Sequence, residues 1–213
     1  MFATRKMKMA MAVAAVAVVG AVAPAMASAD TWSSGGTSFT GPAQLVGTLT
    51  TTAYGTAKNT CSVVAKANLD NGAAGGVARG QISDYLLGIR AGGTCTTALP
   101  NCSLSFTVYT PAGFPSLPSW PIVTSGQNVT VSGIAYGVTY NNSGGSCPLA
   151  GVTQYVQGSM TGTVASGTNF INFSNSPGLT TTFGSGTTSG TLGMYAQNAA
   201  GNWDPSRPIT LQP

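Results

Sequence analysis

Few residues of this 213-residue chain could carry out catalysis, because it contains no histidine and no glutamate. A histidine–carboxylate triad, a histidine metal ligand and a glutamate acting as acid or base are therefore excluded. The only acidic side chains are four aspartates, namely Asp30, Asp70, Asp84 and Asp204. No motif pairs two of them as a glycosidase or an aspartic protease would require. We therefore expect a protein that is not an enzyme, with no catalytic residues and no cofactor.

Local structural roles account for three of the four aspartates. Asp70 opens an Asp-Asn-Gly turn, and Asp204 precedes a proline in a second turn-like segment. Asp84 lies in an apolar run between Arg79 and Arg90, so we expect it to form a surface ion pair, which contributes little to stability. A calcium site at the Asp-Asn-Gly turn would need several more clustered oxygen ligands, and no metal site is predicted.

A serine nucleophile would need a lysine base here, since histidine is absent. After the first eight residues only Lys58 and Lys66 are available, and neither an S-x-x-K nor a G-x-S-x-G motif occurs. Lys66 is more simply an outward-facing residue of a strand. Serine hydrolase chemistry is accordingly not expected.

The chain has four cysteines, at Cys61, Cys95, Cys102 and Cys147. The close C-x₂₋₄-C pairs of zinc sites are missing, and an even number of cysteines in an exported chain indicates two disulfides. Three connectivities are possible. Cys95 and Cys102 enclose a short turn-like loop, which favours a local bridge between them. Cys61 and Cys147 would then join distant strands.

Aromatic side chains are the remaining candidates for ligand contact. Trp120 lies between two prolines in a Leu-Pro-Ser-Trp-Pro segment, and Trp203 lies in an Asn-Trp-Asp-Pro segment. Exposed rings of this kind stack on sugars or contact hydrocarbon, whereas buried ones fill a core. We single out Trp120 and Trp203 as candidate ligand contacts, with core packing as the alternative for each.

The first 29 residues have the pattern of a cleaved signal peptide. Arg5, Lys6 and Lys8 precede an apolar run over 9–23, and an Ala-Ser-Ala site ends at Ala29. We therefore expect a bacterial leader over 1–29 and one β domain over 30–213. That domain would begin with a frayed Asp30 and be secreted or periplasmic, with no transmembrane segment.

Removing this leader changes the charge of the protein. Of its eight basic residues, five remain against the four aspartates, so the formal charge falls from +4 to +1. Nucleic-acid binding depends on clustered lysine and arginine, and it is not expected for a nearly neutral chain.

The elements that must position these residues have the pattern of β-strands. Short runs rich in Val, Thr, Ile and aromatic residues are separated by Gly, Asn, Ser and Pro. Strong helix formers are scarce. The predicted strands cover 45–52, 61–69, 81–89, 102–109, 128–140, 154–164, 170–173 and 191–196. This spacing predicts an all-β fold, either an antiparallel β-sandwich (Greek-key or jelly-roll-like) or a small barrel, with two disulfides.

Several short motifs resemble those of the protein activators of alkane oxidation, a family of exported bacterial β-rich proteins. They are Gly36–Gly41 (Gly-Thr-Ser-Phe-Thr-Gly), Cys61 in its strand, Cys102 followed by Leu117-Pro118-Ser119-Trp120, and Ser143-Gly144-Gly145-Ser146-Cys147 ahead of Gln157–Gly162. The chain departs from the family in the serine inserted before Trp120 and in longer segments over 72–80 and 184–190. The resemblance implies a non-enzymatic accessory that helps cells use hydrophobic substrates, with no catalytic residues.

Three hypotheses follow for the function. The first is an exported, non-catalytic β protein that acts at the cell surface or on hydrophobic substrate. The second is a carbohydrate-binding module, and the third is a subunit of an extracellular fibre or coat. Low charge weakens self-repulsion, so contact with surfaces or self-association is physically reasonable. The sequence leaves the ligand, the strand order and the oligomeric state open.

Overall fold

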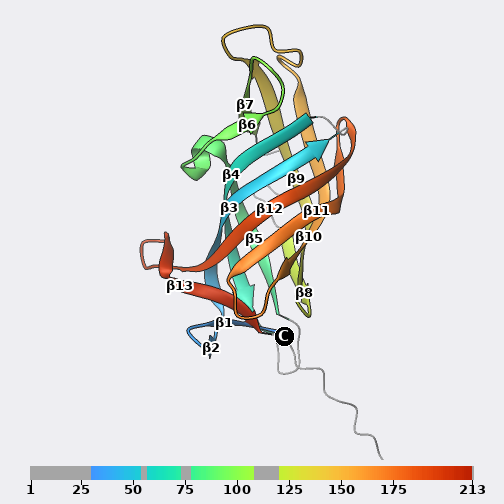
Figure 1. Cartoon of the computed structure of the whole chain (residues 1–213). Coiled ribbons are helices and arrows are strands. Elements are labelled where there is room, and N and C mark those ends of the chain that lie inside the picture. Colours follow the sequence, from blue (N-terminus) through green and yellow to red (C-terminus); the bar gives the residue numbers. More distant parts are fainter. Residues whose placement is uncertain (1–29, 54–56, 73–77, 108–119, 213) are drawn as a thin grey trace, which may run out of the picture.

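Side chains along this chain alternate between buried and exposed positions, as they do in strands with one face on a core. The computed structural model describes residues 30–53, 57–72, 78–107 and 120–212. In these ranges it contains thirteen strands and one 3₁₀ helix (Figure 1). The strands are β1 (Thr31–Ser34), β2 (Thr37–Ser38), β3 (Gly41–Ala53), β4 (Ala57–Asp70), β5 (Arg79–Leu87), β6 (Cys95–Thr97), β7 (Cys102–Thr107), β8 (Trp120–Ser125), β9 (Asn128–Asn142), β10 (Thr153–Val164), β11 (Phe170–Thr181), β12 (Gly184–Gln197) and β13 (Trp203–Gln212), and the helix is η1 (Gly88–Ala91).

Eight of the strands form a sheet that closes on itself. Antiparallel pairing runs in the order β3, β4, β5, β8, β9, β10, β11 and β12, and β12 pairs with β3 again. The strands follow chain order, with only β6 and β7 inserted between β5 and β8. Of the two predicted architectures, the small barrel is therefore the one that forms, with up-and-down connections in place of a Greek key. In Figure 1, β4, β3 and β12 lie side by side across the near face.

The interior of this closed sheet is filled by apolar side chains. Side chains of the long strands alternate between the inside and the outside. In β9, Val129 and Val131 point inward before a register shift, and Ile134, Tyr136 and Val138 point inward after it. One continuous cluster of buried residues runs through the barrel and reaches Trp32 of β1 and Leu211 of β13 at its lower end. A small barrel packed in this way is a solid core without a channel.

At one place in the barrel wall, between β4 and β9, the strands β5 and β8 form one part of the wall and β6 and β7 form the other. We call this place the seam. Strand β5 pairs with residues 63–70 of β4, and after η1 the chain continues as β6, which pairs with residues 59–61 of the same strand. On the other side, β7 pairs with residues 137–142 of β9, and β8 pairs with residues 128–131. Ladder pairing across the seam joins β5 to β8 over Arg79–Ile82, and in the described residues none joins β6 to β7.

All eight predicted strands are present, and six of them are longer than expected. The strand predicted over 81–89 ends at Leu87, and its last two residues belong to η1 instead, because Gly88 turns the chain. Residues 108–109 of the strand predicted over 102–109 lie outside the described residues. The strand predicted over 170–173 extends to Thr181, and that predicted over 191–196 begins at Gly184. The short strands β1, β2 and β6 were missed, as were β8 and β13, which contain prolines. The predicted leader over 1–29 and the motif residues 117–119 lie outside the described residues. Within those residues, no helix has the length and apolarity to cross a membrane.

Candidate functional site

Two disulfides hold the two sides of the seam. Cys61 of β4 is bonded to Cys95 of β6, and Cys102 of β7 is bonded to Cys147 in the loop after β9. The preference for a local bridge between Cys95 and Cys102 is therefore wrong. Those two cysteines begin strands that lie on opposite sides of the seam. One disulfide joins β6 to its paired strand β4, and the other joins β7 to the loop after its paired strand β9. Disulfides form and persist in oxidising surroundings outside the cytoplasm, and this pair indicates such an environment.

The seam contains a cleft of about 490 Å³ between β6 and β7, which we call the seam cleft. Its apolar lining consists of Leu87, Leu104, Phe106 and Cys95, which is disulfide-bonded to Cys61, and Thr94 with two serines contributes hydroxyl groups. None of the lining side chains is charged. A volume of this size lies within the range of small-molecule sites, which are mostly apolar with a few polar groups. The seam cleft can therefore hold an uncharged, largely apolar ligand.

Gly88 shapes the wall of the seam cleft where β5 ends. Its φ is +59°, a conformation that side-chain-bearing residues rarely adopt, and a Cβ at this position would lie 2.9 Å from Sγ of Cys95. Glycine therefore allows the chain to leave β5, form η1 and return as β6 close to the disulfide. The seam cleft thus depends on a backbone turn that only this small residue permits.

An aromatic cluster lies behind the seam cleft. The ring of Phe106 is 6.2 Å from that of Tyr85 in an edge-on arrangement, and Tyr85 lies 4.8 Å from Trp120 and 5.6 Å from Tyr136. Trp120, proposed from the sequence as a ligand contact, is only 4% exposed. Its indole packs in the core next to Tyr85, so in this structure it supports the cleft from behind and offers no face to solvent.

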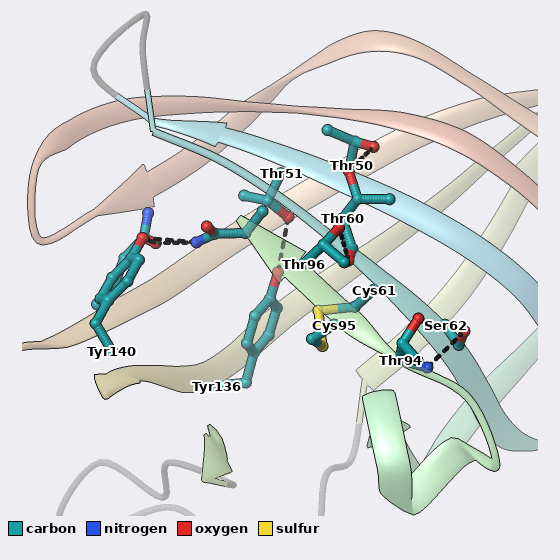
Figure 2. The surroundings of a disulfide bond; sticks show 12 residues. Thr50, Thr51, Thr60, Cys61, Ser62, Thr94, Cys95, Thr96, Tyr136 and Tyr140 are labelled. Carbon is teal, nitrogen blue, oxygen red and sulfur yellow. Dashed lines mark hydrogen bonds between the residues drawn. A yellow bond between two sulfur atoms is a disulfide. The ribbon is translucent and has the colours of Figure 1, made fainter. Parts of the chain in front are cut away.

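Polar side chains occupy the upper part of the barrel interior. Nδ2 of Asn59 donates to the Tyr140 hydroxyl (2.7 Å) and to Oε1 of Gln154 (2.8 Å), and the Tyr140 hydroxyl donates to the same Oε1. The hydroxyl groups of Thr51 and Tyr136 are 3.0 Å apart, and Figure 2 shows this pair beside the Cys61–Cys95 disulfide. Buried polar groups need such partners, because leaving one without a hydrogen bond is costly.

A void next to this polar cluster measures only about 10 Å³. Oδ1 of Asn59 and Nε2 of Gln154 are buried, and neither has a hydrogen-bond partner in the described part of the chain. Both residues line the void, which has room for about one water molecule. The barrel interior therefore does not accommodate an organic ligand in this conformation, and the seam cleft does.

Trp203, the second tryptophan proposed from the sequence, lies on the outside of the molecule. Its side chain is 42% exposed, and its ring centre is 5.3 Å from that of Tyr195 on the neighbouring strand β12. The two tryptophans thus belong to separate ring clusters, one in the core and one at the surface. An exposed tyrosine–tryptophan pair can stack on a sugar ring or contact an apolar surface.

The charged side chains take part in local contacts. Asp84 forms an ion pair with Lys66 (3.6 Å) across β4 and β5, and Asp70 pairs with Arg79 (2.9 Å). The surface ion pair predicted for Asp84 is therefore confirmed, but its partner is Lys66, which the antiparallel register places opposite it, and not an arginine near it in the chain. The hydrogen bond from the Arg79 guanidinium holds the pKa of the Asp70 carboxyl below its usual value.

The other two aspartates have different surroundings. Asp204 lies in β13, so the turn predicted for it is wrong. Its carboxylate accepts hydrogen bonds from the hydroxyl and the backbone amide of Ser206, and these lower the pKa of the carboxyl. Asp30 is buried, and its carbonyl accepts a hydrogen bond from the amide of Ala78, so the prediction of a frayed residue is wrong. Among the described residues, no three Cys or Asp side chains come together as a metal site would require.

Comparison with protein-family models, curated proteins and solved structures finds no match. The candidate site is therefore identified from the geometry of this chain alone. Sequence reasoning missed the seam cleft, although the Ser103–Phe106 alternation and the Gly88–Gly93 segment were visible. The alternation predicted a strand, and only the three-dimensional arrangement shows that its Leu104 and Phe106 border an unpaired part of the wall.

Proposed function

We propose that this protein is an exported, non-catalytic β protein that binds apolar compounds outside the cytoplasm and thereby assists the use of hydrophobic substrate. The observation that carries this proposal is the seam cleft, which combines a volume of about 490 Å³ with an apolar lining and no charged side chain. A linear hydrocarbon has no polar group to satisfy, so it loses nothing by contacting Leu104, Phe106 and the disulfide.

Other features support an extracytoplasmic, non-catalytic role. Two disulfides fit an oxidising compartment, and residues 1–29 have the pattern of an export signal. The chain has neither histidine nor glutamate, and three of its four aspartates are engaged in ion pairs or a local hydrogen bond. The motifs shared with the alkane-oxidation activators point to the same class of substrate.

The proposal is tested by measuring binding of an apolar fluorophore and its displacement by a linear alkane. Ser105 is an exposed residue of the lining, and its hydroxyl accepts a hydrogen bond from Asn141 on the outer face of β9, so Ser105→Trp should cover the open side of the seam cleft while leaving the core unchanged. We expect this variant to bind the fluorophore about tenfold or more weakly, which is the effect of losing roughly 1.4 kcal/mol. Leu104→Asn should act in the same direction by making the lining polar.

Leu99→Asn is the matched control for Leu104→Asn. Leu99 is also partly buried and lies in the turn between β6 and β7, but it is not part of the lining. Its substitution should leave fluorophore binding unchanged. If all three variants bind as the wild-type protein does, the seam cleft is not the binding site and the proposal fails.

A carbohydrate-binding function is the second candidate, and the exposed Tyr195–Trp203 pair favours it. Retention on insoluble polysaccharides should then be lost in Trp203→Ala. A Trp120→Ala variant would lower retention only by disturbing the core. Equal retention of the wild-type protein and Trp203→Ala would exclude this reading.

A further inference from the structure

The register of the sheet brings four apolar side chains together in one row on the outside of the barrel, and the ring of a fifth, Tyr195, lies over the glycine of that row. Phe170 of β11 pairs with Gly193 of β12, Gly193 with Val46 of β3, Val46 with Val64 of β4, and Val64 with Leu86 of β5. The ring of Tyr195 covers Gly193, since a Cβ there would come 2.8 Å from Cε2 of Tyr195. We call Phe170, Tyr195, Val46, Val64 and Leu86 the outer apolar row.

These side chains point away from the core. The residues next to them in the chain are buried, as are Leu45 beside Val46 and Ile171 beside Phe170, and strand side chains alternate between faces. Phe170 is 43% exposed, and Val46, Val64 and Leu86 are half-buried. Trp203, 42% exposed, extends the row beyond Tyr195.

Scattered exposed apolar residues are ordinary, but a contiguous set marks an interaction surface. The outward positions on either side of this row are polar. One flanking row contains Thr191, Thr48 and Ser62. The other contains Lys66 and Asp84, and it continues to Gln44, which is buried and donates a hydrogen bond to the Gly201 carbonyl. The sheet thus presents one apolar band between two polar ones, on the face where Figure 1 shows β4, β3 and β12 side by side.

Shape and charge decide which partner fits this band. It crosses the convex outer wall of a barrel, so it cannot enclose a single molecule, and it suits a deformable apolar phase. Attraction to anionic lipid requires clustered basic residues. The one basic residue in the flanking rows, Lys66, is paired with Asp84 at 3.6 Å. The neutral band therefore favours an uncharged phase over an anionic membrane.

The outer apolar row also leads to the seam cleft. It ends at Leu86, and the next two residues, Leu87 and Gly88, line that cleft. We propose that the outer apolar row is the surface by which the protein adsorbs to the interface between water and an uncharged liquid hydrocarbon, bringing the seam cleft to this phase. The hydrocarbon as substrate class rests on the proposed function, whereas the adsorbing surface rests on the register alone.

The experiment measures the fraction of protein that adsorbs to a hexadecane-in-water emulsion. The test variant carries Val46→Thr, Val64→Thr and Phe170→Thr, because threonine keeps the branched shape that strands favour and replaces apolar surface with a hydroxyl. Loss of this apolar contact area should lower adsorption about tenfold or more. Phe170→Thr alone, at the most exposed position of the row, should lower it in part and serves if the triple variant does not fold.

Val123→Thr is the matched control. Val123 is 51% exposed on β8, outside the row, so the same change there should leave adsorption unaltered. The triple variant should still bind the apolar fluorophore, and Ser105→Trp should still adsorb to the emulsion. These two results separate failure of the adsorbing surface from failure of the seam cleft.

Three results would overturn the inference. The first is equal adsorption by the triple variant, Phe170→Thr and the wild-type protein. The second is binding to anionic phospholipid vesicles as strong as binding to the emulsion, which would identify a membrane as the partner. The third is a concentration-dependent dimer in gel filtration that the triple variant abolishes, which would show that a second copy of the chain covers the row.

Discussion

Removal of either disulfide should cost a substantial part of the stability of this fold. We consider two double variants, Cys61→Ala with Cys95→Ala and Cys102→Ala with Cys147→Ala. Each removes one bridge without leaving a free thiol or placing a polar atom in the core. Both bridges hold short strands, since β6 has three residues and β7 has six. Few ladder hydrogen bonds would keep these strands in place without them.

The expected cost follows from the lengths of the closed loops. The bridged cysteines are separated by 34 and 45 residues. Chain-entropy arithmetic for loops of these lengths gives about 3.8 and about 4.0 kcal/mol at 25 °C. Domains of this kind have a free energy of unfolding of roughly 5–15 kcal/mol, so either loss removes at least about a quarter of it. The two variants should differ from each other by only a few tenths of a kcal/mol.

Urea unfolding followed by tryptophan fluorescence measures these costs, because Trp32 and Trp120 are buried in the folded state. The matched control is the crossed variant Cys95→Ala with Cys102→Ala, which removes one partner from each bridge. It should lose both contributions and therefore have a lower urea midpoint than either paired variant. Thiol titration in denaturant should find two free thiols in the crossed variant and none in the other two.

The reasoning is refuted if the crossed variant is as stable as the paired ones and has no free thiols. That outcome would restore the local bridge between Cys95 and Cys102. A loss below about 1 kcal/mol in both paired variants would refute the magnitude instead, by showing that the denatured chain is little constrained by these loops.

Three further predictions concern the core and the sheet. Tyr140→Phe removes the hydroxyl that is hydrogen-bonded to Asn59 and Gln154, so the free energy of unfolding should fall by about 2 kcal/mol. The surface change Tyr195→Phe is the control and should alter it by no more than about 0.5 kcal/mol. Equal urea midpoints for the two variants would contradict the hydrogen-bond network. Burial raises the pKa of the Tyr85 and Tyr136 hydroxyls, so their contribution is complete below the ordinary tyrosine pKa of about 10 and is lost as pH rises above it. Urea midpoints should therefore fall between pH 9 and pH 12, with phenolate absorbance appearing together with unfolding; gradual ionisation in a protein that stays folded would contradict this. Gly47→Ala places a Cβ against a backbone carbonyl of β12, and we expect thermal unfolding to show a loss of several kcal/mol of stability. Gly201→Ala is the control and should cost less, because nothing lies within 4 Å of its Cβ and only the backbone conformation is strained.

The sequence determined the class of secondary structure and most strand positions. Residues 102–107 alternate Ser and Thr with Leu and Phe, and a period of two can only place the apolar set on one face of a strand. The Asp70-Asn71-Gly72 turn was also readable, and its Asp70 carboxylate accepts from the Gly72 amide as an Asx turn does. Composition alone excluded histidine chemistry.

The seam cleft could not be predicted, because it is a property of two strands that are not neighbours in the ladder. Leu87, Leu104 and Phe106 are ordinary inward residues of their own segments. They border a cleft only because β5 and β8 stop pairing above Ile82 and Trp120 while β6 and β7 take over the wall. Neither periodicity nor propensity records where a ladder ends.

Pairing between distant segments was likewise decided by the tertiary structure. The spacing of Cys95 and Cys102 favoured a local bridge, yet register sets Cys61 opposite Cys95 and leaves Cys102 beside the loop that holds Cys147. The outer apolar row arises in the same way, since Val46, Val64 and Phe170 are far apart in sequence and become neighbours through backbone hydrogen bonds. Local sequence fixes which face of a strand is apolar, while register fixes which side chains of different strands meet.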